Sequence, residues 1–200
     1  MPVSAPDPTG RGPTLLIAER PRDLVGVSAR RGRADALAAA VREAFDLDLP
    51  GPGRFRRGAA LGATSIQPGV WLLDDEPEAP GALHRRVVAA VRDTASVVDQ
   101  SHGRTLVHVA GAAARAVLAT CCRLDLHPRV VTPGMVATTL VAHVPCTLRA
   151  VDDGFELLVG STYAGWLIED LAEASAAAGA EVVRVAPRHR SAILYGGSAR

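Results

Sequence analysis

The sequence contains no lysine and no asparagine, and it has only three cysteines. Because all 22 basic residues are arginines, no lysine can form a Schiff base, bind phosphate in a nucleotide-binding loop or act as a general base. Without asparagine there is no acceptor for N-glycosylation. An odd, sparse set of cysteines also argues against the disulfide framework of a small secreted protein.

Long apolar runs and an excess of charge are missing as well. No segment approaches the roughly 18 consecutive apolar residues of a membrane-spanning helix, and residues 1–13 have no apolar signal core. A formal net charge of +1 gives no bias toward nucleic acids or anionic membranes. We therefore expect a soluble cytoplasmic protein with no nucleic-acid partner and no membrane partner.

Apolar residues, in contrast, are abundant at 48% of the chain, while aromatic residues make up 4%. The apolar share is enough for a sizeable core, which must then consist mostly of alanine, valine and leucine. A length of 200 residues suits one large domain or two small ones.

Short apolar strands alternate with amphipathic helices along the chain. Apolar residues recur at helical spacing in 33–45, 80–92, 111–121 and 163–178. Ser161 or Thr162 is a candidate cap for the last of these helices. Strands are expected at 14–18, 24–28, 58–66, 70–74, 95–98, 104–110, 135–142, 144–151, 155–159 and 181–185.

The second half of the chain echoes the first. Leu47-Asp48-Leu49-Pro50 returns as Leu124-Asp125-Leu126-His127-Pro128, and Pro52-Gly53 returns as Pro133-Gly134. This echo predicts an α+β fold made of two ferredoxin-like split β-α-β units, and two such units can pack around a shared core. We predict the following division: a flexible N-terminal arm over 1–13, a first unit over 14–100, a second unit over 101–186, and a C-terminal tail over 187–200.

Asp99, Ser101 and His102 invite comparison with a hydrolase triad. A triad needs three side chains that converge in space, whereas neighbours on an extended segment point in different directions. No Gly-x-Ser-x-Gly motif accompanies them. We expect a polar turn instead, in which Asp99 or Ser101 bonds to local backbone, and we predict no catalytic residue in this chain.

His127, His143 and the three cysteines Cys121, Cys122 and Cys146 are the candidate metal ligands. Neither Cys-x-x-Cys nor His-x-x-x-His spacing occurs among them. We expect the two adjacent cysteines to act as small apolar residues near a helix end. We therefore predict no metal-binding residue.

Gly111 stands at a strand-to-helix junction, where backbone amides can face an anion. The Gly-x-Gly-x-x-Gly pattern of dinucleotide sites is missing, and a lone glycine favours a simple turn. No cofactor-binding residue is predicted.

Two arginine clusters admit two interpretations. Arg30, Arg31 and Arg33 form one, and residues 54–57 contain the other, Arg54, Arg56 and Arg57. Each can be ordinary solvated loop charge or a surface that docks to an acidic partner, because guanidinium groups suit carboxylates.

The scarce aromatics include Trp71, Tyr163 and Trp166. Trp71 on a strand and Trp166 on a helix are expected to be core or interface anchors. Ile193-Leu194-Tyr195 in the tail suggests a partner-binding arm, with terminal disorder as the alternative.

Several short sequence motifs together resemble those of the gamma subunit of heterotetrameric sarcosine oxidase over roughly residues 14–180. The motifs are Arg20-Pro21-Arg22-Asp23-Leu24-Val25-Gly26, Trp71-Leu72-Leu73, Asp99-Gln100-Ser101-His102-Gly103, Leu124-Asp125-Leu126-His127-Pro128, Pro133-Gly134, Asp152-Asp153-Gly154-Phe155 and Ser161-x-Tyr163-Ala164. One departure is Gly111-Ala112-Ala113-Ala114-Arg115, where family members usually carry Gly-Pro-x-x-Arg, so this loop is expected to differ locally.

The resemblance implies a fold like the folate-binding aminomethyltransferases and a complex with alpha, beta and delta subunits. That complex demethylates sarcosine oxidatively to glycine and makes hydrogen peroxide, with 5,10-methylenetetrahydrofolate or formaldehyde. It implies FAD, FMN, NAD, tetrahydrofolate and zinc in other subunits, and a gamma chain without catalytic residues. Alternatives are a small subunit of a related enzyme such as N-methylglutamate dehydrogenase, a free-standing folate-binding protein, or an isolated regulatory domain.

Overall fold

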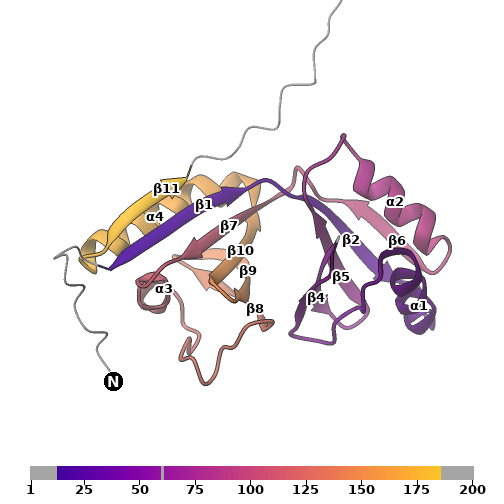
Figure 1. The fold of residues 1–200 in the computed structure, drawn as a ribbon, viewed down its shortest axis with the longest axis horizontal. Coiled ribbons are helices and arrows are strands. Elements are labelled where there is room, and N and C mark those ends of the chain that lie inside the picture. Colours follow the sequence, from indigo (N-terminus) through magenta and orange to yellow (C-terminus); the bar gives the residue numbers. More distant parts are fainter. Residues whose placement is uncertain (1–12, 60, 186–200) are drawn as a thin grey trace, which may run out of the picture.

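A computed structural model of the chain describes residues 13–59 and 61–185, which form two β-sheets with helices on their outer sides (Figure 1). None of the helices in these ranges has the length and apolar character needed to cross a bilayer. The tail predicted over 187–200 and, apart from residue 13, the arm predicted over 1–13 lie outside the described residues.

The first sheet has five strands in the order β3-β4-β5-β2-β6, and all its pairs are antiparallel. Its elements in chain order are β2 (Asp23–Ala29), α1 (Ala34–Phe45), β3 (Phe55–Arg57), β4 (Gly62–Gln67), β5 (Val70–Asp75), α2 (Ala82–Val91) and β6 (Ala95–Asp99). Apart from the short edge strand β3, this is the β-α-β-β-α-β unit of the ferredoxin-like fold.

The second sheet has six strands in the order β11-β1-β7-β10-β9-β8. Its elements are β1 (Thr14–Arg20), β7 (Arg104–Ala110), α3 (Ala114–Cys121), β8 (Val136–Val141), β9 (Val144–Val151), β10 (Gly154–Gly160), the 3₁₀ turn η1 (Ser161–Tyr163), α4 (Ala164–Ala177) and β11 (Glu181–Val185). β7, α3, β9, β10, α4 and β11 repeat the unit seen in the first sheet. The expected α+β fold with two ferredoxin-like units is confirmed.

Strand β1 belongs to the six-stranded sheet, whereas the predicted division placed its residues in the first unit. It is antiparallel to β7 and parallel to β11, and so lies between the first and last strands of the second unit. The division into 14–100 and 101–186 therefore differs from the sheets by this one strand. The physical reason is that strand pairing is non-local, and a short apolar strand carries no information about which sheet it joins.

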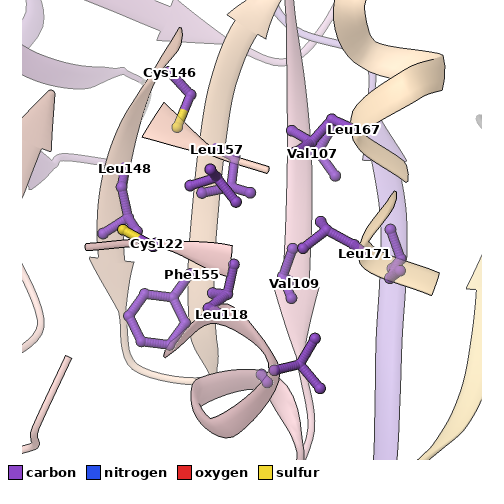
Figure 2. Close-up of a cluster of buried hydrophobic side chains, with 14 of the residues drawn as sticks. Val107, Val109, Leu118, Cys122, Cys146, Leu148, Phe155, Leu157, Leu167 and Leu171 are labelled. Carbon is purple, nitrogen blue, oxygen red and sulfur yellow. The ribbon is translucent and has the colours of Figure 1, made fainter. Parts of the chain in front are cut away.

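Each sheet buries one face beneath its own helices. In the larger core, apolar side chains from β7, β9 and β10 point toward those of α3 and α4 (Figure 2). Its members include Val107, Leu118, Phe155 and Leu171, all at most 1% exposed. α1 and α2 cover the smaller core of the five-stranded sheet. Few of these side chains are aromatic, as the composition predicted.

The other faces of the two sheets meet in a third, smaller cluster. Leu24 and Leu72 from the five-stranded sheet contact Leu106 and Leu158 from the six-stranded sheet, and each is at most 2% exposed. The two units are thus joined by direct packing of sheet against sheet, and buried charged residues continue this contact.

The internal echo marks equivalent places in the two units. Leu47 follows α1 and Leu126 follows α3, and each is buried in the core of its own unit at 1% and 3% exposure. Trp71 lies on β5 and Phe155 lies on β10, the third strand of each repeated unit.

Local differences from the predicted elements are small. The strand expected at 58–66 begins later, as β4 at Gly62–Gln67, and the short strand β3 at Phe55–Arg57 was not predicted. Neither Ser161 nor Thr162 caps the last helix, since α4 has no side-chain cap; the Ser161 hydroxyl donates instead to the His102 carbonyl at 2.9 Å. The hydroxyl thereby ties η1 to the loop before β7.

Candidate functional site

Asp99 and Ser101 close a turn between β6 and β7. The Ser101 hydroxyl and amide both donate to Asp99 Oδ1, at 2.6 and 2.9 Å, and the hydroxyl accepts the Leu24 amide at 3.0 Å. Partial burial raises the pKa of Asp99, but the hydrogen bonds from Ser101 outweigh it and hold that pKa below 3.8. A carboxylate held in this way is a weak base, so the geometry suits a turn that links β2 to the β6–β7 loop.

The cysteines lie at the end of α3 and on β9. Cys122 and Cys146 lie among the side chains of the larger core (Figure 2). They are 8% and 4% exposed, and the Cys122 sulfur lies 3.6 Å from Thr139 Oγ1. Burial raises the pKa of Cys146 to about 12, with a further contribution from nearby Cys122. This thiol therefore stays protonated, which disfavours both metal binding and nucleophilic attack.

The two histidines considered as candidate metal ligands, His127 and His143, lie in different loops. The His127 ring accepts the Arg129 amide through Nδ1 at 3.2 Å, and His143 stands at the β8–β9 turn with φ +66°. Within residues 13–59 and 61–185, no three His, Cys, Asp or Glu side chains gather in a way that could hold a metal ion.

Gly111 makes a close backbone crossing at the end of β7. Its φ is +95°, and a Cβ atom there would lie 2.5 Å from the Thr14 carbonyl oxygen. That carbonyl accepts the Ala113 amide at 3.1 Å. The junction is therefore occupied by strand β1 and its backbone.

The two arginine clusters have different surroundings. In the first, Arg33 pairs with Asp93 at 2.7 Å, while Arg30 and Arg31 are exposed. In the second, Arg56 pairs with Asp48 at 3.0 Å. The remaining member with an ion pair, Arg57, has a side chain 37% exposed, and its guanidinium approaches one buried carboxylate from each sheet.

Arg57 belongs to a buried network of charges that sequence reasoning missed. At its centre the fully buried Arg149 on β9 reaches Asp74 on β5 at 2.8 Å and Glu156 on β10 at 3.3 Å. Arg57 on β3 approaches the same two carboxylates at 3.3 and 3.7 Å. The Phe55 ring lies under both guanidinium groups, with centroid distances of 4.6 Å to Arg149 and 5.2 Å to Arg57.

This network joins the two units. Asp74 comes from the five-stranded sheet and is 0% exposed, whereas Glu156 comes from the six-stranded sheet and has a side chain 4% exposed. Gly62 faces Asp74 across the β4–β5 pair, where a Cβ atom would lie 2.6 Å from a carboxylate oxygen. Two positive and two negative groups balance, so the arrangement suits a structural link between the sheets. The sequence signal that could have revealed this network was Arg149, a charged residue inside the largely apolar strand β9.

His108 is another buried polar residue, and it lies on β7 opposite Glu156 of β10, on the same face of the six-stranded sheet. It is 1% exposed, and its Nε2 lies 3.2 Å from an Asp153 carboxylate oxygen. Burial and the charge of Arg20 lower the pKa of His108 below 6.5, although Asp153 and Glu156 oppose the shift. The imidazole is therefore neutral in the folded protein at neutral pH.

The aromatic anchors fall into two classes. Trp71 is half-buried beside the smaller core and donates from Nε1 to the Pro50 carbonyl at 2.8 Å. Tyr163 and Trp166, in contrast, are 54% and 76% exposed at the start of α4. This pair makes the surface of α4 the strongest candidate site for a partner.

Comparison with known proteins agrees with the resemblance read from the motifs. The family model described as sarcosine oxidase, gamma subunit family, matches residues 30–177. The sarcosine oxidase subunit gamma of Corynebacterium sp. strain P-1 is 30% identical over 145 residues, which cover 68% of this chain and 70% of the relative. The corresponding subunit of Arthrobacter sp. is 33% identical over 129 residues, which cover 62% of this chain and 61% of the relative.

Solved structures extend the agreement to the fold. A chain of the heterotetrameric sarcosine oxidase from Corynebacterium sp. U-96, in complex with pyrrole 2-carboxylate, superimposes with a TM-score of 0.72 at 26% identity, covering 84% of this chain and 87% of that one. The glycine cleavage system aminomethyltransferase T from Bartonella henselae matches with a TM-score of 0.59 at 18% identity, covering 86% of this chain and 48% of that one. The second match shows a shared fold.

Proposed function

Because the chain belongs to the sarcosine oxidase, gamma subunit family, we propose that it is a non-catalytic gamma subunit that supports assembly of a heterotetrameric sarcosine oxidase. Its partners are then alpha, beta and delta subunits, in the cytoplasm. The reaction of the complex is oxidative demethylation of sarcosine to glycine, with hydrogen peroxide and either 5,10-methylenetetrahydrofolate or formaldehyde as further products.

The observation that carries this proposal is the family match over residues 30–177, together with the superposition on a heterotetrameric sarcosine oxidase. The local chemistry supports a non-catalytic role. The Ser101 hydroxyl is engaged by Asp99 and the Leu24 backbone, and the Cys146 thiol is protonated in a core. The charged groups between the sheets pair with one another.

The cofactors implied for such a complex are FAD, FMN, NAD, tetrahydrofolate and zinc. The donor set of residues 13–59 and 61–185 does not fit a zinc site, because no cluster of suitable side chains forms there. We assign these groups to the partner chains. The contribution of this chain is then a pair of packed units whose outer surfaces contact the other subunits.

Co-expression with the alpha, beta and delta genes of the same host tests the proposal. The expected result is one complex that contains this chain, absorbs as a flavoprotein and makes hydrogen peroxide from sarcosine, while the isolated chain shows neither property. Turnover of N-methylglutamate in place of sarcosine would favour the related dehydrogenase. Tight binding of tetrahydrofolate by the isolated chain would overturn the subunit assignment in favour of a free-standing folate-binding protein.

A further inference from the structure

Helix α4 has two long stripes of different character. The residues that face the larger core are buried or nearly so: Ala164, Leu167, Leu171 and Ser175. The second stripe is exposed to solvent and follows the same three- and four-residue spacing, which brings its side chains together on one side of the helix. We call it the aromatic-acidic stripe, and it consists of Tyr163, Trp166, Asp170 and Glu173.

The aromatic end of this stripe is unusual for the chain. Trp166 is 76% exposed and Tyr163 is 54% exposed, whereas the other aromatic residues that the structure describes are buried or half-buried. The Tyr163 ring also lies against Gly160, where a Cβ atom would come within 3.3 Å of the ring. Single exposed apolar residues are common, but two adjacent exposed aromatics are typical of binding hot spots.

The carboxylates at the acidic end of the stripe are not paired with cations from the described residues around them. Glu169, just beside it, forms a bidentate pair with Arg184 at 2.7 and 3.0 Å. Asp170 and Glu173 are exposed, and neither has an ion pair within residues 13–59 and 61–185. In the part of the chain that the structure describes, the stripe therefore presents two aromatic rings next to two carboxylates without an ion pair.

We infer that the aromatic-acidic stripe is a docking surface for another subunit of the complex, one that offers an apolar pocket to Trp166 and arginine or lysine side chains to Asp170 and Glu173. The inference rests on the proposed function and adds the surface and the chemistry of the partner. Complementary charge selects the partner and speeds association, while a buried aromatic supplies most of the binding free energy.

A second copy of this chain fits the stripe poorly. In a two-fold symmetric dimer each copy presents the same four side chains, so neither copy's stripe supplies a cation to pair with Asp170 and Glu173. A partner subunit with a basic surface provides the missing cations, so the inference commits to such a partner.

The test is a competition during assembly. Wild-type and variant chains with different tags are co-expressed with the alpha, beta and delta subunits, and their ratio in the purified complex is measured. Trp166→Ala removes the ring, and Asp170→Arg with Glu173→Arg reverses the charge. Each is expected to reduce incorporation about tenfold or more, as loss of a hot spot does. Thermal melting of the isolated variants should match wild type, since these side chains are exposed.

Matched controls come from the other unit. Val98→Ala removes an apolar side chain that is 58% exposed on β6, and Glu43→Arg reverses an exposed charge on α1. Both are expected to enter the complex as wild type does. A loss of incorporation equal to that of the stripe variants would overturn the inference, because any surface change would then act alike.

The outcomes separate the two proposals. If the wild-type chain does not join the complex, the proposed function fails. If wild type joins and Trp166→Ala joins equally well, the docking surface is wrong while the proposed function stands. A wild-type chain that dimerises alone through Trp166, or one whose residues 187–200 shield this side chain from a fluorescence quencher, would also overturn the choice of partner.

Discussion

Replacing Arg149 with methionine should lower the free energy of unfolding by about 3 kcal/mol. Arg149 is 0% exposed, and it lies within 3.3 Å of the Asp74 and Glu156 carboxylates, which are themselves buried. Removing one partner from a buried ion pair leaves uncompensated charge in a poorly hydrated site and costs ~3–5 kcal/mol. Methionine keeps much of the side-chain volume, so a cavity adds little to this cost.

The lower end of that range is expected because one guanidinium remains. Arg57 still approaches both carboxylates, at 3.3 and 3.7 Å, but its side chain is 37% exposed and its field is partly screened by water. Since small domains have a total stability of only about 5–15 kcal/mol, a loss of about 3 kcal/mol is easily measured. Urea unfolding followed by circular dichroism gives the difference directly.

A second variant tests the physical reason for the loss. Combining Arg149→Met with Asp74→Asn and Glu156→Gln removes the buried charges while keeping the side-chain shapes. Because the cost comes from unpaired buried carboxylates, this triple variant should be more stable than Arg149→Met alone. Arg184→Met, which breaks the exposed pair with Glu169, serves as the control and should leave the unfolding midpoint nearly unchanged.

Two results would refute this reasoning. One is a cost below about 1 kcal/mol for Arg149→Met, the size expected of a surface ion pair. The other is a triple variant less stable than the single one, which would mean that hydrogen bonds rather than charge compensation hold the sheets together at this point.

Three further predictions concern backbone geometry and buried titratable groups. Gly154→Ala should destabilise the fold by at least ~2 kcal/mol in urea unfolding, because φ is +151° and the new Cβ would lie 2.3 Å from a β7 carbonyl oxygen. Gly165→Ala is the control. Because open space surrounds this position on α4, the change should be neutral or stabilising by about 0.5 kcal/mol. Since burial raises the pKa of Cys146 to about 12 from 9.0, the folded state holds its proton longer than the unfolded state, so stability should fall as pH rises above 9, and Cys146→Ala should flatten that decline in thermal melts. The lowered pKa of His108 has the opposite consequence, because the unfolded chain takes up a proton near pH 6.5 while the folded chain does not. The free energy of unfolding should therefore fall as the pH drops from 7 to 5.5. If His108→Gln showed the same dependence of stability on pH, this assignment would be contradicted.

Much of the fold follows from local sequence patterns. The helix expected over 33–45 is α1 at Ala34–Phe45, and the strand expected over 104–110 has those bounds as β7. Periodicity predicts such elements because each one must bury a single stripe or face. The internal echo and the family resemblance then indicate how the elements combine, and the two ferredoxin-like units and the family are confirmed.

The predicted roles of individual residues depended on information beyond the local pattern. Trp166 was expected to be a core or interface anchor, and only its exposed fraction of 76% distinguishes these alternatives. The arginines at positions 54–57 are interpreted from sequence as one cluster, yet Arg56 pairs with an exposed carboxylate while Arg57 pairs with buried carboxylates of both sheets. Adjacent strand residues point to opposite faces, but the sequence does not say which face is covered.

The sequence by itself determined the elements, the duplication, the scarcity of aromatic side chains in the core and the family of this protein. Only the tertiary structure decided that β1 pairs with β7 and β11, and that Arg149 meets Asp74 across two sheets. The physical reason is distance along the chain. Helical and strand periodicity arise between near neighbours, whereas a buried ion pair or a strand pairing is selected by the packing of the whole molecule.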